Sequence, residues 1–372
     1  MSAMRLRIGL VGPLPPPSGG MANQTRQLGR LLEEEGHAVD LVQTNAPYRP
    51  AWAGKLRGVR ALFRLAPYVI RLWRAAGRAQ VLHVMANSGW SWHLCAAPAV
   101  WIARLRGVPV VINYRGGGAE AFLARSSWLV RPTVRLAERL IVPSGFLKEV
   151  FSRFGLSADV VPNIVDLRRF SPGPRRARAA GEGAHLIVTR NLEPVYDVAG
   201  ALRALALVLQ RLPGARMTIA GSGPERERLA GLARALGVDG RVTFTGRLDN
   251  ERIAELYRDA DVFINPSLVD NMPISVLEAM ASGVPVVSTN VGGVPFIAEH
   301  GRTALLVPPR DAEAMARALL ELLADPGAAQ RLAGAARESV QQYSWRRVRG
   351  TLLGLYQELA AGSRPGAAAE IE

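Results

Sequence analysis

Two carboxylates, Asp270 and Glu278, are separated by seven residues in DNMPISVLEAMASGVPVVSTN, which covers residues 270 to 290. Asp270 lies in a polar loop, and Glu278 lies about one turn into an apolar helix that we expect to begin near Ile274. A carboxylate accepts hydrogen bonds from hydroxyl groups, including the vicinal diol of a ribose. The spacing therefore predicts that the two carboxylates hold the two ends of a nucleotide sugar.

The loop between these carboxylates is suited to phosphate. Backbone amides that precede a helix lie at its positive end, where anions bind. The amides expected at this position are those of Asn271, Met272 and Ile274.

Glycine-rich turns supply two further candidate phosphate sites. Gly19 and Gly20 precede a segment of helix length, and glycine at a helix N-terminus lets a phosphate approach the amides closely. A plain turn is the alternative there. Gly221 lies in AGSGPERERL, residues 220 to 229, which lacks the third glycine of a dinucleotide fingerprint. This turn therefore fits a nucleotide but does not predict a nicotinamide cofactor.

Arg190 ends the predicted strand HLIVTR, residues 185 to 190. At such a position an arginine can hold a diphosphate through two parallel, charge-assisted hydrogen bonds. A solvated surface arginine is the alternative.

These residues follow short β-branched runs that alternate with helix-length segments along the entire chain. Strands are expected at residues 7–12, 38–43, 81–85, 109–114, 139–144, 159–163, 185–190, 216–221, 241–246, 261–267, 285–290 and 304–309. Continuously apolar strands separated by helices predict parallel sheets covered on both faces. Two such sets predict an α/β protein of two Rossmann-like, doubly wound domains, with ligands beyond the carboxyl ends of the strands, in a cleft between facing domains.

The expected boundaries follow from composition. Residues 1–170 form the first domain, and residues 171–184, SPGPRRARAAGEGA, form a linker without periodic apolar positions. Residues 185–343 form the second domain. A final helix at 344–360 has one apolar face that must pack on another part of the chain.

Composition limits the class of protein. With 372 residues, 49% hydrophobic and 21% charged, the chain is predicted to be globular rather than disordered. Cys95 is the single cysteine, which favours a reducing, cytoplasmic compartment. No signal peptide is predicted, and the most apolar run, residues 94–103, is much shorter than the roughly 20 residues that span a bilayer.

Metal chemistry is not predicted. The five histidines do not form a cluster with ligand spacing. Asp259 and Asp261 resemble a metal-binding Asp-x-Asp pair, but they lie where a helix ends and a strand begins, which favours a structural role. His83, inside a strand, is expected to be a hydrogen-bonded core histidine.

The positive charge is concentrated in the first half. Residues 1–180 contain 26 Lys and Arg against 9 Asp and Glu, a net +17, and residues 181–372 contain 20 against 22, a net −2. This asymmetry indicates an anionic membrane or nucleic acid beside the first half. A generally arginine-rich composition is the alternative, because only Lys55 and Lys148 are lysines. No nucleic-acid-binding motif is present.

Residues 52–78 are the segment best suited to such a partner. Arginines recur at helical spacing on both sides of Pro67, with aromatic and aliphatic residues between them. They are Arg57, Arg60, Arg64, Arg71, Arg74 and Arg78. A basic, aromatic, amphipathic helix favours an anionic membrane surface. A helix pair that packs its apolar side into the core is the alternative.

The run PSLVDNMPISVLEAMASGVPVVSTNVGGVPFIAEHG resembles the donor-binding signature of family-4 retaining glycosyltransferases, which have the GT-B fold. The resemblance extends over nearly the whole chain, through the glycines at 19 and 20, VPNIVDLRRFSP at 161–172, AGSGPERERL, VTFTGRL at 242–248 and the terminal helix. It implies catalytic roles for Arg190 and Asp270. The donor-binding residues that it implies are Gly19, Gly20, Arg190, Gly221, Arg247, Asp270, Asn271, Met272, Pro273, Ile274 and Glu278.

The chain departs from the family pattern at three places. Asp270 stands where the family usually has glutamate. The lysine that usually helps to bind the diphosphate is replaced by Val195 or Tyr196. Tyr114 and Arg115 occupy a loop where relatives often carry histidine, and we expect them beside the acceptor.

The resemblance implies a metal-independent enzyme without a cofactor that transfers a sugar, with retention, from a nucleotide diphosphate to a lipid-linked or polysaccharide acceptor. In the implied mechanism the leaving phosphate takes the proton of the acceptor. The protein is expected to be cytoplasmic and peripheral on the inner face of the membrane. A nucleotide-sugar epimerase and a non-catalytic binding protein of the same fold are the alternatives.

Overall fold

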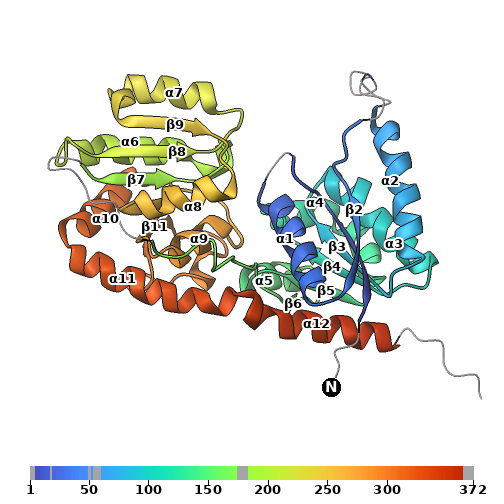
Figure 1. Cartoon of the computed structure of the whole chain (residues 1–372). Helices are drawn as coiled ribbons and strands as arrows, with labels where there is room; N and C mark the ends of the chain where they lie inside the picture. The colour runs from blue at the N-terminus through green and yellow to red at the C-terminus, as the bar shows by residue number, and fades with distance from the viewer. Residues whose placement is uncertain (1–4, 17–18, 49–51, 53–59, 174–182, 363–372) are drawn as a thin grey trace, which may run out of the picture. The chain divides into compact units, whose positions relative to one another are not determined.

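The structure is a computed structural model that describes residues 5–16, 19–48, 52, 60–173 and 183–362. The chain forms two compact units (Figure 1). The first unit extends to Pro162 and includes the C-terminal residues from Val348 onward. The second unit comprises Asn163–Arg347.

The first unit is built on a parallel sheet of six strands in the order β2-β1-β3-β4-β5-β6. Its strands are β1 (Arg7–Gly12), β2 (Ala38–Gln43), β3 (Val81–Ala86), β4 (Val110–Tyr114), β5 (Arg139–Val142) and β6 (Asp159–Val160). Its helices are α1 (Gly20–Glu34), α2 (Arg60–Ala76), a π-helical turn (Trp92–Ala96), α3 (Ala97–Leu105), α4 (Ala119–Arg135) and α5 (Gly145–Arg153). All residues of β3 and β4 are buried, as expected for strands covered on both faces.

The last helix, α12 (Trp345–Gly362), belongs mainly to the first unit. Its buried residues are Val348, Leu352, Tyr356, Leu359 and Ala360, and the hydroxyl of Tyr356 lies 2.6 Å from Nδ1 of the buried His83. Ion pairs from Arg349 to Glu35 and from Arg139 to Glu358 fix the helix further.

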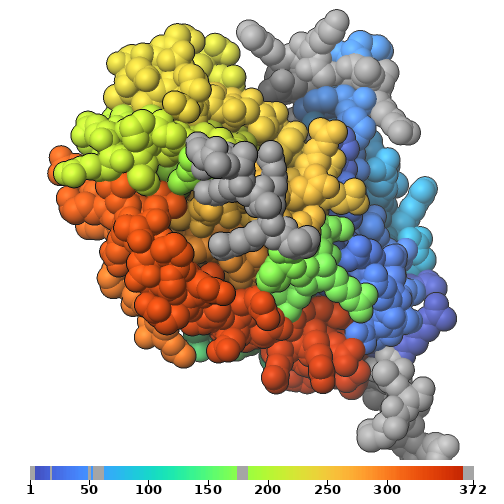
Figure 2. Space-filling model, turned by 60° about the vertical axis from the view of Figure 1, so that its left-hand side comes forward, coloured from blue at the N-terminus to red at the C-terminus, as the bar shows by residue number. Residues whose placement is uncertain are grey.

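The second unit contains another parallel sheet of six strands, in the order β12-β11-β10-β7-β8-β9. Its strands are β7 (His185–Val188), β8 (Arg216–Ala220), β9 (Val242–Gly246), β10 (Val262–Asn265), β11 (Val286–Thr289) and β12 (Leu305–Val307). Its helices are α6 (Val198–Leu209), α7 (Arg226–Ala235), α8 (Asn250–Asp259), α9 (Ile274–Ala281), α10 (Ala312–Ala324) and α11 (Pro326–Ser339). Helix α10 packs against α6, and Figure 2 shows α10 and α11, in orange, at the surface of this unit beside the yellow-green α6.

The twelve expected strands are all present, and α9 begins at the predicted Ile274. The unit boundary lies earlier than the predicted residue 170. Asn163 donates to the carbonyl of Met272 at 2.8 Å, and Val165 N–H donates to the carbonyl of Tyr343, so this segment belongs to the second unit. Of the predicted linker, residues 174–182 lie outside the described residues.

The order of the second sheet determines where its ligand site can form. From β7 the chain builds β8 and β9 on one side, and β10, β11 and β12 on the other. The carboxyl ends of β7 and β10 are therefore neighbours at the point where the strand order reverses, which is where doubly wound sheets bind ligands. None of the described helices combines the length with the apolar character needed to cross a bilayer.

Candidate functional site

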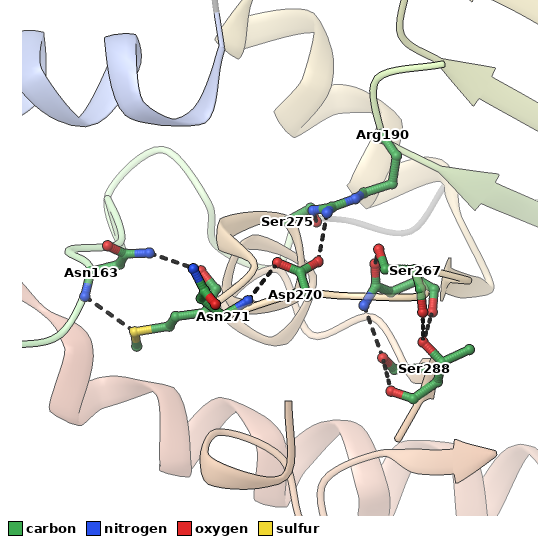
Figure 3. A network of polar contacts seen from close by, with 10 residues as sticks. Asn163, Arg190, Ser267, Asp270, Asn271, Ser275 and Ser288 are labelled. Carbon is green, nitrogen blue, oxygen red and sulfur yellow. Dashed lines mark hydrogen bonds and ion pairs between the residues drawn. The ribbon is translucent and has the colours of Figure 1, made fainter. Parts of the chain in front are cut away.

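Arg190 and Asp270 meet at this point of the second sheet. Arg190 follows β7 and Asp270 follows β10, and Arg190 Nη2 lies 2.5 Å from Asp270 Oδ2 (Figure 3). The second terminal nitrogen, Nη1, donates to Ser275 Oγ at 3.2 Å. Both side chains of the ion pair are nearly buried, with 10% and 12% exposure. A buried arginine held on both terminal nitrogens is fixed in orientation before any ligand arrives.

The remaining part of the guanidinium faces Tyr196. The Arg190 Cζ lies 4.1 Å from the centre of the Tyr196 ring, a distance at which a cation and an aromatic face attract each other. Leu268 N–H donates to the carbonyl of Val195, which ties this turn to the loop that carries Asp270. Among the described residues, Arg190 Nε is buried without a hydrogen-bond partner. This donor is therefore suited to an anionic oxygen of a ligand.

Asp270 is held by the backbone as well as by Arg190. The Asn271 N–H donates to Asp270 Oδ1 at 3.1 Å, so this amide orients the carboxylate. Burial raises the pKa of Asp270, and the Arg190 guanidinium acts in the opposite direction. The ion pair thus offsets the desolvation of the carboxylate.

A buried polar network supports the loop that carries Asp270. Ser267 Oγ donates to Asn265 Oδ1 at 2.9 Å, and Asn265 Nδ2 donates to Ser288 Oγ at 3.0 Å. Thr289 Oγ1 donates to the carbonyl of Ser267 at 2.5 Å. Figure 3 shows this group on the side of Asp270 opposite Asn163. Because all its members are buried and hydrogen-bonded, the network fixes the ends of β10 and β11.

Glycines bring the backbone of neighbouring loops into contact beneath these residues. A Cβ on Gly292 or Gly293 would lie 2.1 or 1.5 Å from the carbonyl oxygens of Asp270 and Asn271. A Cβ on Gly221 would lie 1.9 Å from the carbonyl oxygen of Arg190. These glycines are therefore required for close packing of the loops. The sequence prediction singled out Gly221 but not the Gly292–Gly293 pair, which the GG dipeptide after a strand could have indicated.

Met272 and Pro273 are the last two residues of the loop before α9. Met272 is 4% exposed within the core, and its carbonyl accepts from Asn163 Nδ2. Pro273 lacks an N–H and precedes Ile274 at the start of α9. The loop reaches the N-terminus of α9 as predicted, with the side chain of Met272 packed inward.

Glu278 lies in the second turn of α9 beside Tyr257. The Tyr257 hydroxyl is 3.4 Å from Glu278 Oε2, 2.9 Å from the carbonyl oxygen of Ser275 and 2.7 Å from Thr189 Oγ1. Burial raises the pKa of Glu278 to about 8, while the Tyr257 hydrogen bond and the charges of Arg169 and Arg190 lower it. At neutral pH a carboxyl with this pKa is largely protonated and becomes a better acceptor when a ligand ionises it.

Tyr257 and Ser275 were not predicted as site residues. Tyr257 is completely buried and links the end of β7 to α9. The one sequence signal for Ser275 is its position one residue into α9. No local pattern indicates that it contacts Arg190.

The first unit presents a different group at the ends of β1 and β4. Gly19 caps α1 and Gly20 begins it, and a Cβ on either would meet no described atom within 4 Å. Arg115 follows β4, and its Nε donates to Asn113 Oδ1 at 3.1 Å while Nη1 donates to Gln24 Oε1 at 3.3 Å. The network connects the first turns of α1 to the end of β4.

Tyr114 does not share this position. Its side chain is completely buried, packs against Phe151 with ring centres 4.9 Å apart, and pairs its hydroxyl with Ser88 Oγ at 2.6 Å. A core residue has no surface for an acceptor, so we retain only Arg115 as a candidate there. His83 is also buried, as predicted, between Asn113 and Tyr356, and burial lowers its pKa to about 3.

Arg247 is separated from the Arg190 group. It is exposed after β9, and β8 lies between β9 and β7. Asp259 and Asp261 have structural roles: Asp259 pairs with Arg216 and His185, and Asp261 accepts from His185 N–H at 2.6 Å. In the part of the chain that is described, no three His, Cys, Asp or Glu side chains gather where they could hold a metal ion.

The arginines of residues 52–78 do not form one continuous stripe. Helix α2 continues through Pro67, and Arg71 and Arg74 are exposed. Arg78 pairs with Asp40, and Arg64 stacks on Tyr48 at 4.2 Å. Arg57 and the side chain of Arg60 lie outside the described residues.

Comparison with protein families accounts for both units. The model of the glycosyltransferase family 4 matches residues 18–169, and the model of glycosyl transferases group 1 matches residues 175–339. The chain belongs to the family-4 glycosyltransferases. The second match contains Arg190, Asp270 and Glu278.

Curated relatives agree with this assignment. A glycogen synthase of Mycobacterium tuberculosis is 27% identical over 96% of both chains. A GDP-mannose-dependent alpha-(1-6)-phosphatidylinositol monomannoside mannosyltransferase of the same species is 29% identical over 89% of this chain and 92% of the relative. A D-inositol 3-phosphate glycosyltransferase of Saccharomonospora viridis is 34% identical over 63% of this chain and 58% of its own length. The protein is therefore a glycosyltransferase.

Solved structures show the same fold. A sucrose-phosphate synthase from Thermosynechococcus elongatus matches with a TM-score of 0.76 and 24% identity, over 96% of this chain and all of that chain. Anabaena Alr3699/HepE in complex with UDP matches with a TM-score of 0.74 and 17% identity, over 95% of this chain and all of that chain. The two parallel six-stranded sheets with their flanking helices are a GT-B architecture, as predicted.

Proposed function

We propose that this glycosyltransferase moves a sugar from a nucleotide-diphosphate donor to a lipid-linked or polysaccharide acceptor, with retention of configuration. The names of relatives support the substrate classes: one is a GDP-mannose-dependent enzyme of phosphatidylinositol monomannoside, and Alr3699/HepE was solved with UDP and with UDP-glucose. The proposal applies these classes to this chain without naming the base, the sugar or the linkage.

The preformed group of Arg190, Asp270 and Ser275 carries the proposal. Arg190 is anchored on both terminal nitrogens and keeps a buried Nε donor without a partner among the described residues. A diphosphate gains negative charge on its leaving oxygen as the glycosidic bond breaks. A fixed cation at that place stabilises the transition state more than the ground state.

The proposed reaction proceeds on the front face of the sugar. The acceptor oxygen attacks the anomeric carbon on the side of the departing phosphate, the bond from that carbon to the phosphate oxygen breaks, and the acceptor proton passes to the leaving phosphate. Asp270 accepts from hydroxyls of the transferred sugar, and Arg190 and the N-terminus of α9 stabilise the departing charge. These groups supply the charge stabilisation without requiring a resident metal ion or another cofactor.

Glu278 is the proposed ribose ligand. A ribose diol that donates to both carboxylate oxygens favours the ionised form and therefore lowers the pKa that burial has raised to about 8. Tyr257, within 3.4 Å of the same carboxyl, keeps it in place.

The first unit is proposed to bind the acceptor. Arg115 is positioned by Asn113 and Gln24, while Gly19 and Gly20, which leave space around the N-terminus of α1, keep the donor-binding role proposed for them. We place the enzyme in the cytoplasm, on the inner face of the membrane, with the exposed Arg71 and Arg74 of segment 52–78 toward anionic lipid.

A substrate screen tests the proposal. The purified chain is incubated with a panel of nucleotide sugars, with and without lipid extracts, and products are followed by mass spectrometry and by NMR of the anomeric centre. We expect one donor to be consumed with transfer to lipid or polysaccharide, retained configuration and full activity in EDTA. Donor converted to another nucleotide sugar without an acceptor would show an epimerase instead. Binding of a nucleotide sugar without turnover would show a non-catalytic protein.

A further inference from the structure

Three helices of the first unit each expose a tryptophan. Trp73 on α2, Trp101 on α3 and Trp128 on α4 are 44%, 48% and 72% exposed. Large aliphatic residues on the same helices are exposed as well: Ile70 by 52%, Leu105 by 73% and Leu129 by 46%. We call these six residues the tryptophan face. Single exposed apolar residues are ordinary, but six on adjacent elements indicate an interaction surface.

Contacts link the three helices that carry these residues. The guanidinium of Arg106, just after α3, lies 4.8 Å from the Trp73 ring on α2. Trp101 Nε1 on α3 donates to Thr133 Oγ1 on α4 at 3.2 Å. Helix α2 packs on α3, and α3 packs on α4, so the three lie in this order along one sheet (Figure 1). Because the Trp101 N–H already has a partner, its ring can enter an apolar medium without leaving a donor unsatisfied.

The exposed charge on the three helices and just beyond their ends is mostly positive. The exposed charged residues from the described side chains of α2 to the end of α4 are Arg71, Arg74, Arg78, Arg104, Arg106, Glu120, Arg125 and Arg135. Glu120, the acidic member, pairs with Arg153 at 2.7 Å. A second copy of this chain using the same face would bring arginines against arginines, which disfavours a symmetric dimer. Exposed apolar rings and arginines on the same group of helices fit the interface of an anionic bilayer, where phosphates meet acyl chains.

We propose that the tryptophan face is the surface by which the protein lies on anionic lipid. Trp73, Trp101 and Trp128 enter the boundary between headgroups and acyl chains, and the surrounding arginines contact lipid phosphates. This inference deepens the proposed function, on which it rests for the lipid-linked acceptor. It replaces a contact through one amphipathic segment by a surface of three packed helices, of which α3 and α4 lie outside residues 52–78.

Vesicle binding of the full chain tests this surface. Co-sedimentation is measured with phosphatidylcholine vesicles with and without phosphatidylglycerol, at low and high salt. We expect binding to the anionic vesicles that weakens with salt, and quenching of tryptophan fluorescence by brominated lipid. Trp73→Gln and Trp128→Gln should each reduce vesicle partitioning roughly tenfold, because each removes an apolar ring from the interface.

Two matched controls come from the second unit. Phe296→Gln removes an aromatic side chain that is 46% exposed, and Arg317→Gln removes an arginine that is 69% exposed. Both should bind vesicles as the wild type does. A charge variant, Arg71→Gln with Arg74→Gln and Arg125→Gln, should lose most of the salt-sensitive binding and keep the tryptophan quenching at high protein concentration.

The outcomes separate the alternatives. Wild-type vesicle binding in both tryptophan variants, or no brominated-lipid quenching in the wild type, overturns the proposal. So does duplex DNA binding that the same variants abolish, since the face would then serve a nucleic acid. Thermal melting shows that each variant is folded. Vesicle binding without turnover of any donor would refute the proposed function alone, and donor turnover without vesicle binding would refute the tryptophan face alone.

Discussion

The two sheets carry their key arginines in different settings. In the second unit Arg190 is held by the carboxylate of Asp270, at 2.5 Å, and by Ser275. In the first unit Arg115 is held by the amide oxygens of Asn113 and Gln24. Both follow a strand of a parallel six-stranded sheet, so similar topology positions the two guanidinium groups at corresponding edges.

The difference in partners has a chemical consequence. A carboxylate partner offsets the charge of Arg190, whereas amide partners orient Arg115 without adding negative charge. Burial lowers the pKa of Arg115 to about 10, which still leaves it protonated at neutral pH. This difference fits the proposed roles, in which the second unit stabilises the charge of the leaving phosphate and the first unit binds the acceptor.

Loss of the Arg190 cation should have the largest effect. Arg190→Ala is expected to lower kcat about 10² to 10³-fold, with a smaller change in donor affinity, because the phosphate charge grows in the transition state. Rates are measured with the identified donor, and affinity by calorimetry. Arg317→Ala, at an exposed position of the same unit, is the control. Wild-type kcat in Arg190→Ala would show that other groups neutralise the diphosphate.

Removal of Glu278, the residue proposed to bind the ribose, should weaken donor binding. Glu278→Ala is expected to weaken donor affinity by about 1–3 kcal/mol through the loss of charged hydrogen bonds. Calorimetry on the folded variant measures this, with Glu313→Ala, whose side chain is 80% exposed, as the control. Unchanged affinity would remove Glu278 from the site.

Replacement of Arg115 in the first unit should change the KM for the acceptor. Arg115→Gln is expected to raise the acceptor KM roughly tenfold while the KM for the donor changes little, because a charged hydrogen bond to the acceptor is lost. Initial rates with each substrate varied in turn measure this. Arg30→Gln, on α1 with a side chain that is 52% exposed, provides a control in the same unit. An equal rise of both KM values would contradict the division of roles between the units.

Loss of the Tyr196 ring should lower kcat less than loss of Arg190 does. Tyr196→Ala removes the ring that stacks on Arg190 and is expected to lower kcat a few-fold, in line with about 0.5–1 kcal/mol for such a contact. Tyr196→Phe keeps the ring and should remain close to wild type. Equal losses in both variants would assign the effect to the hydroxyl instead of the stacking.

Proton linkage at Glu278 gives the most subtle signal. Its pKa in the folded protein is raised from 4.5 to about 8, so the stability that it contributes is complete below pH 4.5 and is lost as the pH rises through 8. The difference in melting temperature between Glu278→Gln and the wild type should therefore shift in favour of the variant as the pH rises from 5 to about 9.

Proton release on donor binding should reveal the ionisation of Glu278. If the ribose ionises Glu278, up to about one proton is released per donor at pH 7, which calorimetry in buffers of different ionisation enthalpy detects. The release should be absent in Glu278→Gln. Equal release from both proteins would assign the proton to another group.

The sequence by itself determined the local elements. Strands of the second sheet lie within the predicted ranges, and α9 begins at the predicted Ile274, because apolar runs, turn residues and helix periodicity act over a few neighbouring residues. The same patterns placed Arg190 and Asp270 after strands. Periodicity could not show that the two side chains form an ion pair.

Tertiary structure decided which of these residues meet. Arg190 contacts Asp270 because β7 and β10 are neighbours in a sheet whose order reverses between them, although they are distant in the sequence. Tyr114 was expected near an acceptor and is instead buried, since the side chains of a strand alternate between faces and both faces of this sheet are covered. The tryptophan face depends in the same way on three helices packing side by side, and such long-range contacts are what no short pattern in the sequence contains.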